Sequence, residues 1–279
     1  MSDLHLEVGQ QNDTFEIKPC APYLILAGDI GRLMDYDGFR AFLSLQCEHF
    51  TQVYLIVGNH EFFGVSRSEG LHLVDKLQEE ATLRERLIIM NRRRVDLPAV
   101  TVLGCTLQSF IPPEAEDIVG YRVNDFHHIK DWKVADHNAE HHQDVEWLKK
   151  EIKSIRDIKT DAKRKILVIT HHAPSHKGTS NPAYERNAIS SAFCTDLMQQ
   201  RKRSPLDDVQ WWVFGHTHYC MESTRGTVRL IANQRGYVFP NARPFRPELG
   251  TSFMTRMQTL LGAGPKMEMA FDPEKVINV

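Results

Sequence analysis

Short apolar runs alternate along the chain with stretches whose apolar residues recur at helical spacing. Runs of four or five consecutive apolar residues have the length and composition of strands buried on both faces. They occupy residues 23–27, 53–57, 166–169 and 211–214. Between them, apolar side chains three or four positions apart predict helices around residues 39–47, 71–81 and 145–152. This alternation of strand and helix predicts an α/β fold.

The apolar pattern predicts the structure of other segments less clearly. Residues 100–105 predict another buried strand, and residues 228–232 and 267–271 read as strands near the end of the chain. Residues 110–135 are rich in Pro, Asp, His and Trp and predict a long functional loop, a candidate lid, ahead of a helix around Asn138. The pattern does not decide whether residues 233–265 form an ordered structure. No linker divides the chain, so we expect residues 1–279 to form a single domain.

Composition narrows the function classes. The chain is 42% hydrophobic and 25% charged, as in globular proteins, and its net charge of -2 gives no long-range attraction to nucleic acid or anionic membranes. No apolar run approaches the ~18 residues of a membrane span, and the first ten residues lack the basic stretch followed by an apolar stretch that is typical of a signal peptide. Five cysteines, an odd number without a CxxC pair, favour a reducing compartment. We therefore expect a cytoplasmic protein without a membrane partner.

Polar clusters carry the candidate chemistry, and all but the first directly follow a predicted strand. The clusters are Asp3-Leu4-His5, Gly28-Asp29, Gly58-Asn59-His60-Glu61, His171-His172 and Gly215-His216-Thr217-His218. Loops at the carboxyl ends of neighbouring strands converge, so these clusters are expected to form one site. Their carboxylate, imidazole and amide donors suit Mn, Fe, Zn, Co or Ni. Seven donors suggest two ions, with Asp29 as the carboxylate between them.

In this order the clusters resemble the D-x-H, GD, GNH[DE], H and GHxH motifs of the calcineurin-like metallophosphoesterases, from Asp3 to His218. The resemblance implies a four-layer α/β/β/α sandwich and a centre of two divalent or trivalent ions, with Mn, Fe and Zn left open. It assigns the first ion to Asp3, His5, Asp29 and His218, and the second to Asp29, Asn59, His171 and His216.

The resemblance also implies roles outside the ligand set. His60 is expected to steady the phosphoryl oxygens or to protonate the leaving alkoxide, a task that suits imidazole. His172 is read as either a ligand-supporting donor or a substrate contact, and Asn124, Arg235 and Tyr237 are further candidate substrate contacts. His137, His141 and His142 are interpreted as surface histidines, because the H-E-x-x-H arrangement of zinc peptidases is missing.

Two departures from the family pattern matter. Only Met1 and Ser2 precede Asp3, which is far short of the ~5 residues of a typical strand. We therefore expect the first strand to be truncated, as in a shortened gene model, and Asp3 and His5 to lie on a frayed terminus that binds the first ion weakly. The second cluster continues as Ile30-Gly31-Arg32 instead of the G-D-x-x-D-R-G of the protein Ser/Thr phosphatases, which disfavours that branch.

The predicted function is metal-dependent hydrolysis of a phosphate monoester or diester by a two-metal-activated hydroxide, on a small-molecule or nucleotide substrate. A non-catalytic interaction module on the same fold is the alternative. Retained Asp29 and His60 argue against it, and the short N-terminus argues for it. A nuclease is least favoured, because the balanced charge offers no basic channel. The sequence leaves substrate, metal identity, protein partners and oligomeric state open.

Overall fold

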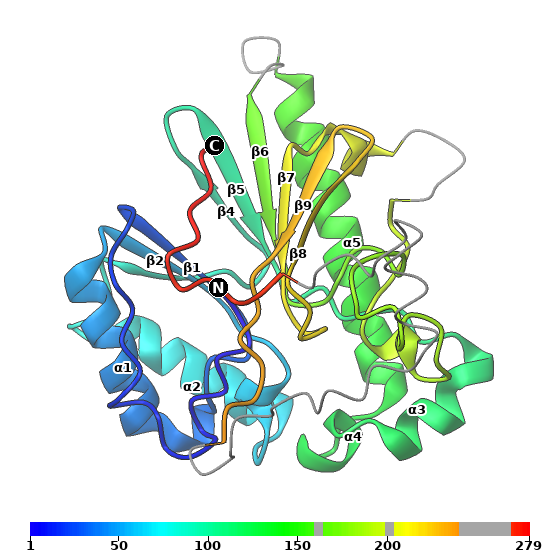
Figure 1. Ribbon diagram of the computed structural model, residues 1–279, viewed down its shortest axis with the longest axis horizontal. Coiled ribbons are helices and arrows are strands. Elements are labelled where there is room, and N and C mark those ends of the chain that lie inside the picture. Colours follow the sequence, from blue (N-terminus) through cyan, green and yellow to red (C-terminus); the bar gives the residue numbers. More distant parts are fainter. Residues whose placement is uncertain (159–163, 199–203, 240–268) are drawn as a thin grey trace, which may run out of the picture.

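The computed structural model describes residues 1–158, 164–198, 204–239 and 269–279, and it contains two β-sheets (Figure 1). The smaller sheet has the order β1-β2-β3, with all strands parallel. These strands are β1 Tyr23–Ala27, β2 Gln52–Ile56 and β3 Leu87–Ile89. Parallel strands need crossover connections. The crossover between β1 and β2 is helix α1 (Tyr36–His49), and that between β2 and β3 is α2 (Arg67–Glu79).

The larger sheet has the order β4-β5-β6-β7-β9-β8. Its strands are β4 Arg93–Asp96, β5 Val100–Gly104, β6 Lys165–Ile169, β7 Trp211–Phe214, β8 Met221–Arg225 and β9 Val228–Ala232. The central four strands are parallel, and antiparallel β4 and β8 close the two edges. The long helix α5 (Val134–Asp157) connects β5 to β6 through residues 105–164.

Alternation along the strands divides the apolar side chains among three layers of core. In β6, Ile166 and Val168 pack toward α5, whereas Leu167 and Ile169 pack between the two sheets. Strands β1 and β2 divide in the same way, with one face against α1 and α2 and the other in the central layer. Three apolar layers separate four layers of secondary structure, so the chain is an α/β/β/α sandwich, as predicted. Figure 1 shows α1 and α2 on one side and α5 on the opposite side.

Differences from the expected elements have local causes. Residues 110–135 are not a structureless loop, because they hold the short helices α3 (Glu116–Arg122) and α4 (Asp125–His128). The expected strand at residues 267–271 lies partly outside the described residues, and within 269–271 only Met269 makes an isolated bridge, to Cys220. No helix in the described parts of the chain has the length and apolar character needed to cross a membrane.

The N-terminus is held between the sheets, so the expectation of a frayed end was wrong. Ser2 makes only an isolated bridge, to Gln234, and no strand precedes β1. However, the Met1 amino group donates to the Ile25 carbonyl at 2.8 Å, and Ser2 N donates to the Asn233 carbonyl at 3.1 Å. These bonds on both sides fix the next residues, and both Asp3 and His5 are fully buried.

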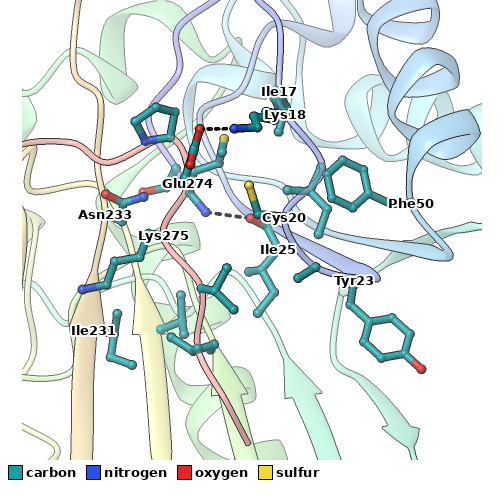
Figure 2. A pocket seen from close by; sticks show the side chains of 18 of the residues that line it. Ile17, Lys18, Cys20, Tyr23, Ile25, Phe50, Ile231, Asn233, Glu274 and Lys275 are labelled. Atoms are coloured by element: carbon teal, nitrogen blue, oxygen red, sulfur yellow. Dashed lines mark hydrogen bonds and ion pairs between the residues drawn. The ribbon is translucent and has the colours of Figure 1, made fainter.

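A pocket of about 100 Å³ lies beside this terminus, lined by β1, the end of β9 and the C-terminal segment. Figure 2 shows Lys18 paired with Glu274 there, at 2.8 Å. None of the predicted ligands or catalytic residues lines this pocket. The candidate site is therefore a different region of the molecule.

Candidate metal centre

The predicted ligands converge from both sheets. Asp29 follows the end of β1 by two residues, and Asn59 follows the end of β2 by three. His171 and His216 each follow their strand, β6 or β7, by two residues. Asp3 and His5 come from the N-terminal segment, whose amides bond to the Gly28 and Asp29 carbonyls at 3.0 Å. The site therefore bridges the two sheets at the carboxyl ends of their strands.

Asp3, His5 and His218 form the first group, with ligand atoms all within 4.8 Å of one another. The Nε2 atoms of His5 and His218 are 3.0 Å apart, and Asp3 Oδ1 lies 3.5 Å from His218 Nε2. The second carboxylate oxygen of Asp29, Oδ2, is 3.9 Å from His5 Nε2. Imidazole nitrogens and carboxylate oxygens thus point at one small volume, as expected of ligands around one ion.

Asp29, His171 and His216 form the second group under the same 4.8 Å limit. His171 Nε2 is 3.3 Å from Asp29 Oδ1 and 2.9 Å from Asn59 Oδ1. Asp29 therefore presents Oδ1 to this group and Oδ2 to the first. That is the position required of a carboxylate between two ions.

An unpaired buried nitrogen tests whether these residues suit a metal. His216 Nε2 is buried without a hydrogen-bond partner among the described residues, which is costly unless something binds it. Burial, followed by repulsion from His171, holds the pKa of His216 well below its ordinary value, so this imidazole is neutral. A neutral imidazole with a free nitrogen is the form that binds a metal. The donor set therefore fits a metal ion.

The electrostatics of the second group also favour a bound cation. Burial opposes ionisation of Asp29, but His171 outweighs it and holds the pKa of this carboxyl well below its usual range. Burial also opposes protonation of His171, yet Asp29 raises its pKa to about 10. Oxygen atoms of Asp29 and Asn59 thus favour positive charge at His171 Nε2. A proton or a metal cation satisfies that preference.

Backbone strain concentrates at the ligands. Asp3, His5, Asp29, His216 and His218 all have φ between 47° and 70°, the left-handed region that side chains rarely adopt. Each such residue costs of order 1–3 kcal/mol and persists only where the surroundings hold it. The fold supports this strain at five of its seven predicted ligands, which is typical of functional sites.

Two motif glycines are required by close approach to the ligands. A Cβ on Gly58 would lie 2.3 Å from Asp29 Oδ1, and one on Gly215 would lie 2.7 Å from Asp3 Oδ2. Any side chain at either position would displace a carboxylate of the site. The Gly-Asn and Gly-His dipeptides of the motifs therefore have a steric origin.

Glu61 ties the loops after β1 and β2 together, a role not assigned from the sequence. Its carboxyl group is fully buried and accepts from the backbone N–H groups of Asp29 (3.0 Å), Ile30 (2.7 Å) and Gly58 (2.7 Å). Burial and nearby Asp29 raise the pKa of Glu61 to about 8. Its place directly after Gly-Asn-His was the only sequence signal for this role.

Asp125 orients the amide of Asn59. Asn59 Nδ2 donates to Asp125 Oδ1 at 2.7 Å, which turns the opposite atom, Oδ1, toward His171. An amide has one oxygen and one nitrogen, so fixing the nitrogen selects the oxygen as the ligand atom. The two residues are 66 positions apart, and nothing in the sequence pairs them.

His60 stands at the edge of the two groups, held by an unpredicted carboxylate. Its Nδ1 is 3.0 Å from Glu7 Oε1, and its Nε2 is 3.0 Å from the Tyr237 hydroxyl. The same Glu7 oxygen lies 3.2 Å from His5 Nδ1. Burial opposes ionisation of Glu7, but hydrogen bonds from His5 and His60 outweigh it and lower its pKa to about 2. An ionised Glu7 thus orients one predicted ligand and the predicted catalytic imidazole.

The remaining candidates divide between the pocket and the interior. Asn124 and Tyr237 line the pocket of the centre, whereas Arg235 and His172 do not. The Arg235 guanidinium donates to the Leu4 carbonyl (3.2 Å) and to Gln11 Oε1 (2.8 Å), and so supports the N-terminal segment. His172 is fully buried, with its ring centroid 4.1 Å from that of His216, and so lies behind this ligand.

The interpretation of the α5 histidines needs correction. His137 is 1% exposed and His141 is 5% exposed, so neither is a surface residue, whereas His142 is exposed. His137 contacts Ser109 at 3.3 Å, and burial lowers its pKa to about 3. His141 Nδ1 bonds the Gln108 carbonyl. Both histidines therefore join α5 to the loop after β5.

The pocket over the centre has a volume of about 300 Å³. Asp29, Asn59, His60, His216 and His218 form its floor, and residues 122–125 together with Ile189, Phe193, Thr217 and Tyr237 complete its lining. Arg122 supplies a cation to this lining. The volume is at the lower end of the ~300–1,000 Å³ of small-molecule sites.

Sequence comparison matches most of the chain to known proteins. A family model described as calcineurin-like phosphoesterase matches residues 1–220. An uncharacterized protein of Acanthamoeba polyphaga mimivirus is 23% identical over 265 residues, which are 85% of this chain and 90% of that protein.

One solved structure shares the fold, and a second gives a weaker match. A phosphopantetheinyl hydrolase from Mycobacterium tuberculosis has a TM-score of 0.64 at 19% identity, covering 85% of this chain and 88% of its own. A dimetal phosphatase from Danio rerio has a TM-score of 0.46 at 15% identity, covering 83% of this chain and 76% of its own. Since the family model spans most of the chain, the chain belongs to the calcineurin-like phosphoesterases, a family of metal-dependent hydrolases.

Proposed function

We propose that this phosphoesterase holds two metal ions and hydrolyses the phosphate ester of a small molecule or nucleotide. The observation that carries the proposal is the position of Asp29, whose Oδ1 lies 3.3 Å from His171 Nε2 and whose Oδ2 lies 3.9 Å from His5 Nε2. Asp3, His5, Asp29 and His218 would hold one ion, and Asp29, Asn59, His171 and His216 the other. When bound, such a pair supplies a nucleophilic water at neutral pH and charge compensation for the phosphoryl group.

His60 is proposed as the catalytic side chain. Glu7 fixes its Nδ1, so its Nε2 is directed to the Tyr237 hydroxyl at the edge of the pocket. An imidazole held there can donate to a phosphoryl oxygen or pass its proton to the leaving alkoxide. Tyr237 shares this position and can donate to the same oxygen atoms. Both side chains line the pocket of the centre, where a substrate can reach them.

Hydrolysis of para-nitrophenyl phosphate and bis-para-nitrophenyl phosphate with manganese tests the proposal. We expect activity in the parent chain and a loss of roughly 10²–10⁴-fold in His60→Ala, the range for a removed general acid or base. His72→Ala, an exposed histidine of α2, is the matched control and should retain full activity. The ratio of the two rates separates monoester from diester preference. A parent that is inert on both esters would favour the interaction-module alternative.

A further inference from the structure

A second cavity adjoins the pocket of the metal centre. It has a volume of about 160 Å³ and shares Ile189, Phe193 and Thr217 with the first pocket. Thr217 lies between the predicted ligands His216 and His218, and the Phe193 ring stacks on the His216 ring with centroids 4.7 Å apart. A substrate bound over the metal centre can therefore extend into this second cavity without leaving the protein surface.

The chemistry of the second cavity differs from that of the first. Among the described residues of its lining none carries a charge, and the lining combines hydroxyl and amide groups with the rings of Tyr184 and Phe193. The side chain of Tyr184 is available for contact, because this residue is 64% exposed. Aromatic side chains in a polar, uncharged lining suit a flat group that stacks and also forms hydrogen bonds.

Two asparagines supply donors to this cavity. Asn181 Oδ1 accepts from the Ala183 amide and Asn187 Oδ1 accepts from the Ile189 amide, both at 3.0 Å. These bonds fix the orientation of each side-chain amide, because its Oδ1 is turned toward the backbone of its own loop. Each Nδ2 group remains a donor, and within the described residues neither has a hydrogen-bond partner. Ring nitrogens and carbonyl oxygens of a ligand are the matching acceptors.

We propose that this cavity binds the base of a nucleoside phosphate whose phosphoryl group lies over the metal centre. The proposal rests on the proposed function, since it places the reacting phosphate in the first pocket. Stacking on Tyr184 and Phe193 binds the face of the base, and Asn181 and Asn187 bind its edge. The substrate class is therefore a nucleotide or nucleoside phosphodiester.

Other organic groups fit less well. An acyl chain would leave the two Asn amides and the neighbouring hydroxyls buried without partners, which costs free energy for each group. A second phosphate or another strongly anionic group would find no cation in this lining. Arg122, the cation near the site, lines the first pocket instead. A neutral heterocycle accepts hydrogen bonds from the Asn amides and needs no cation in the lining.

Two chromogenic diesters with the same leaving group test the proposal. We would compare the para-nitrophenyl ester of thymidine 5′-phosphate with methyl para-nitrophenyl phosphate, using the manganese-loaded chain. We expect kcat/KM to be at least about tenfold higher for the nucleoside ester, and Tyr184→Ala to remove most of that advantage, in line with stacking energies. Tyr184→Phe should retain it. Asn187→Asp, which keeps the acceptor for Ile189, should reduce it.

Direct binding of the free nucleosides thymidine and adenosine, measured by saturation-transfer NMR, gives a readout that does not need turnover. Tyr121→Ala is the control, because this tyrosine of α3 is 79% exposed and does not line the second cavity. Equal kcat/KM for the two diesters, with no nucleoside binding, would overturn the subsite but leave the phosphoesterase intact. Nucleoside binding that is lost in Tyr184→Ala, in a chain that cleaves neither these diesters nor para-nitrophenyl phosphate, would support the subsite and refute the proposed function.

Discussion

At the scale of single residues, the candidate ligands are held by carboxylates that are not themselves predicted ligands. Glu7 is the clearest case, since one of its oxygens lies within 3.2 Å of both His5 Nδ1 and His60 Nδ1. Each of those rings must present its other nitrogen toward the site. We expect a residue that fixes two imidazoles at once to support both metal binding and catalysis, although it belongs to no recognised motif of the sequence.

Glu7→Gln tests this role. The amide keeps the size of the side chain but removes the charge and supplies one acceptor in place of two. We expect activity on bis-para-nitrophenyl phosphate to fall by about 10–100-fold, the usual cost of losing such a supporting group, with weaker manganese affinity from the His5 side. Glu16→Gln, an exposed glutamate of the same segment, is the control. Unchanged activity and affinity in Glu7→Gln would refute the assigned role.

The candidate ligands could be proposed from the sequence, whereas the side chains that hold them in place could not. Each motif is a run of a few residues, and all but Asp3-Leu4-His5 follow a strand, so local order was enough to find them. Glu7 and His60 are 53 positions apart, and Asn59 and Asp125 are 66 apart. Such pairs come into contact only when distant loops pack together in the folded chain. A single sequence contains no signal that predicts which loops will pack together.

At the scale of elements, the apolar runs predicted the strands that are buried on both faces. The strands that escaped prediction are short or polar: β3 has three residues, β4 reads Arg-Arg-Val-Asp, and β8 reads Met-Glu-Ser-Thr-Arg. Backbone pairing with a neighbouring strand, rather than side-chain pattern, gives these edge strands their structure. The helices α3 and α4 were also missed, since seven and four residues are too few to show a helical period.

Helix α5 is joined to the loop after β5 by a buried carboxylate. Asp144 accepts from the Leu107 amide at 2.8 Å, where Leu107 has φ of 52°, and pairs with Arg92 at 2.7 Å. Burial raises the pKa of Asp144 to about 6, although the Arg92 charge opposes this and Glu140 adds to it. The ordinary pKa of an unfolded Asp is ~3.9.

A pH dependence follows from this difference. Between pH ~4 and ~6 the folded chain binds more protons at Asp144 than the unfolded chain, so this group lowers the free energy of unfolding as the pH rises through that window. Relative to Asp144→Asn, the parent should lose about 2 kcal/mol between pH 4 and pH 7, measured by urea unfolding. Asp157→Asn, exposed on the same helix, should show no such change. A stability difference between the parent and Asp144→Asn that stays constant with pH would contradict the account.

At the scale of the whole molecule, the centre is also a joint between the two sheets. Asp29 and Asn59 follow strands of the smaller sheet, whereas His171 and His216 follow strands of the larger sheet. A bound metal would therefore add a connection between two layers that also meet through the central apolar core and through the N-terminal segment. Metal binding should stabilise the fold as well as support chemistry.

Removal of metal tests this connection. A ligand present at 100 times its Kd stabilises the native state by ~2.7 kcal/mol, and each kcal/mol corresponds to roughly 2–4 °C in a chain of this size. We expect a chelator to lower the Tm of the manganese-loaded parent by at least several degrees. In Asp29→Asn, which loses the carboxylate between the groups, the shift should be much smaller. Equal shifts in the two proteins would show that manganese binds elsewhere.

The central claim is that two ions act together in one active site, and an activity titration tests it most directly. The chain is stripped of metal, held at a concentration well above the metal Kd, and titrated with manganese while hydrolysis of bis-para-nitrophenyl phosphate is followed. The account predicts no activity without metal and a rise that ends at two equivalents per chain. Full activity at one equivalent of manganese would contradict the account. Activity that does not depend on manganese and persists in the presence of a chelator would contradict it as well.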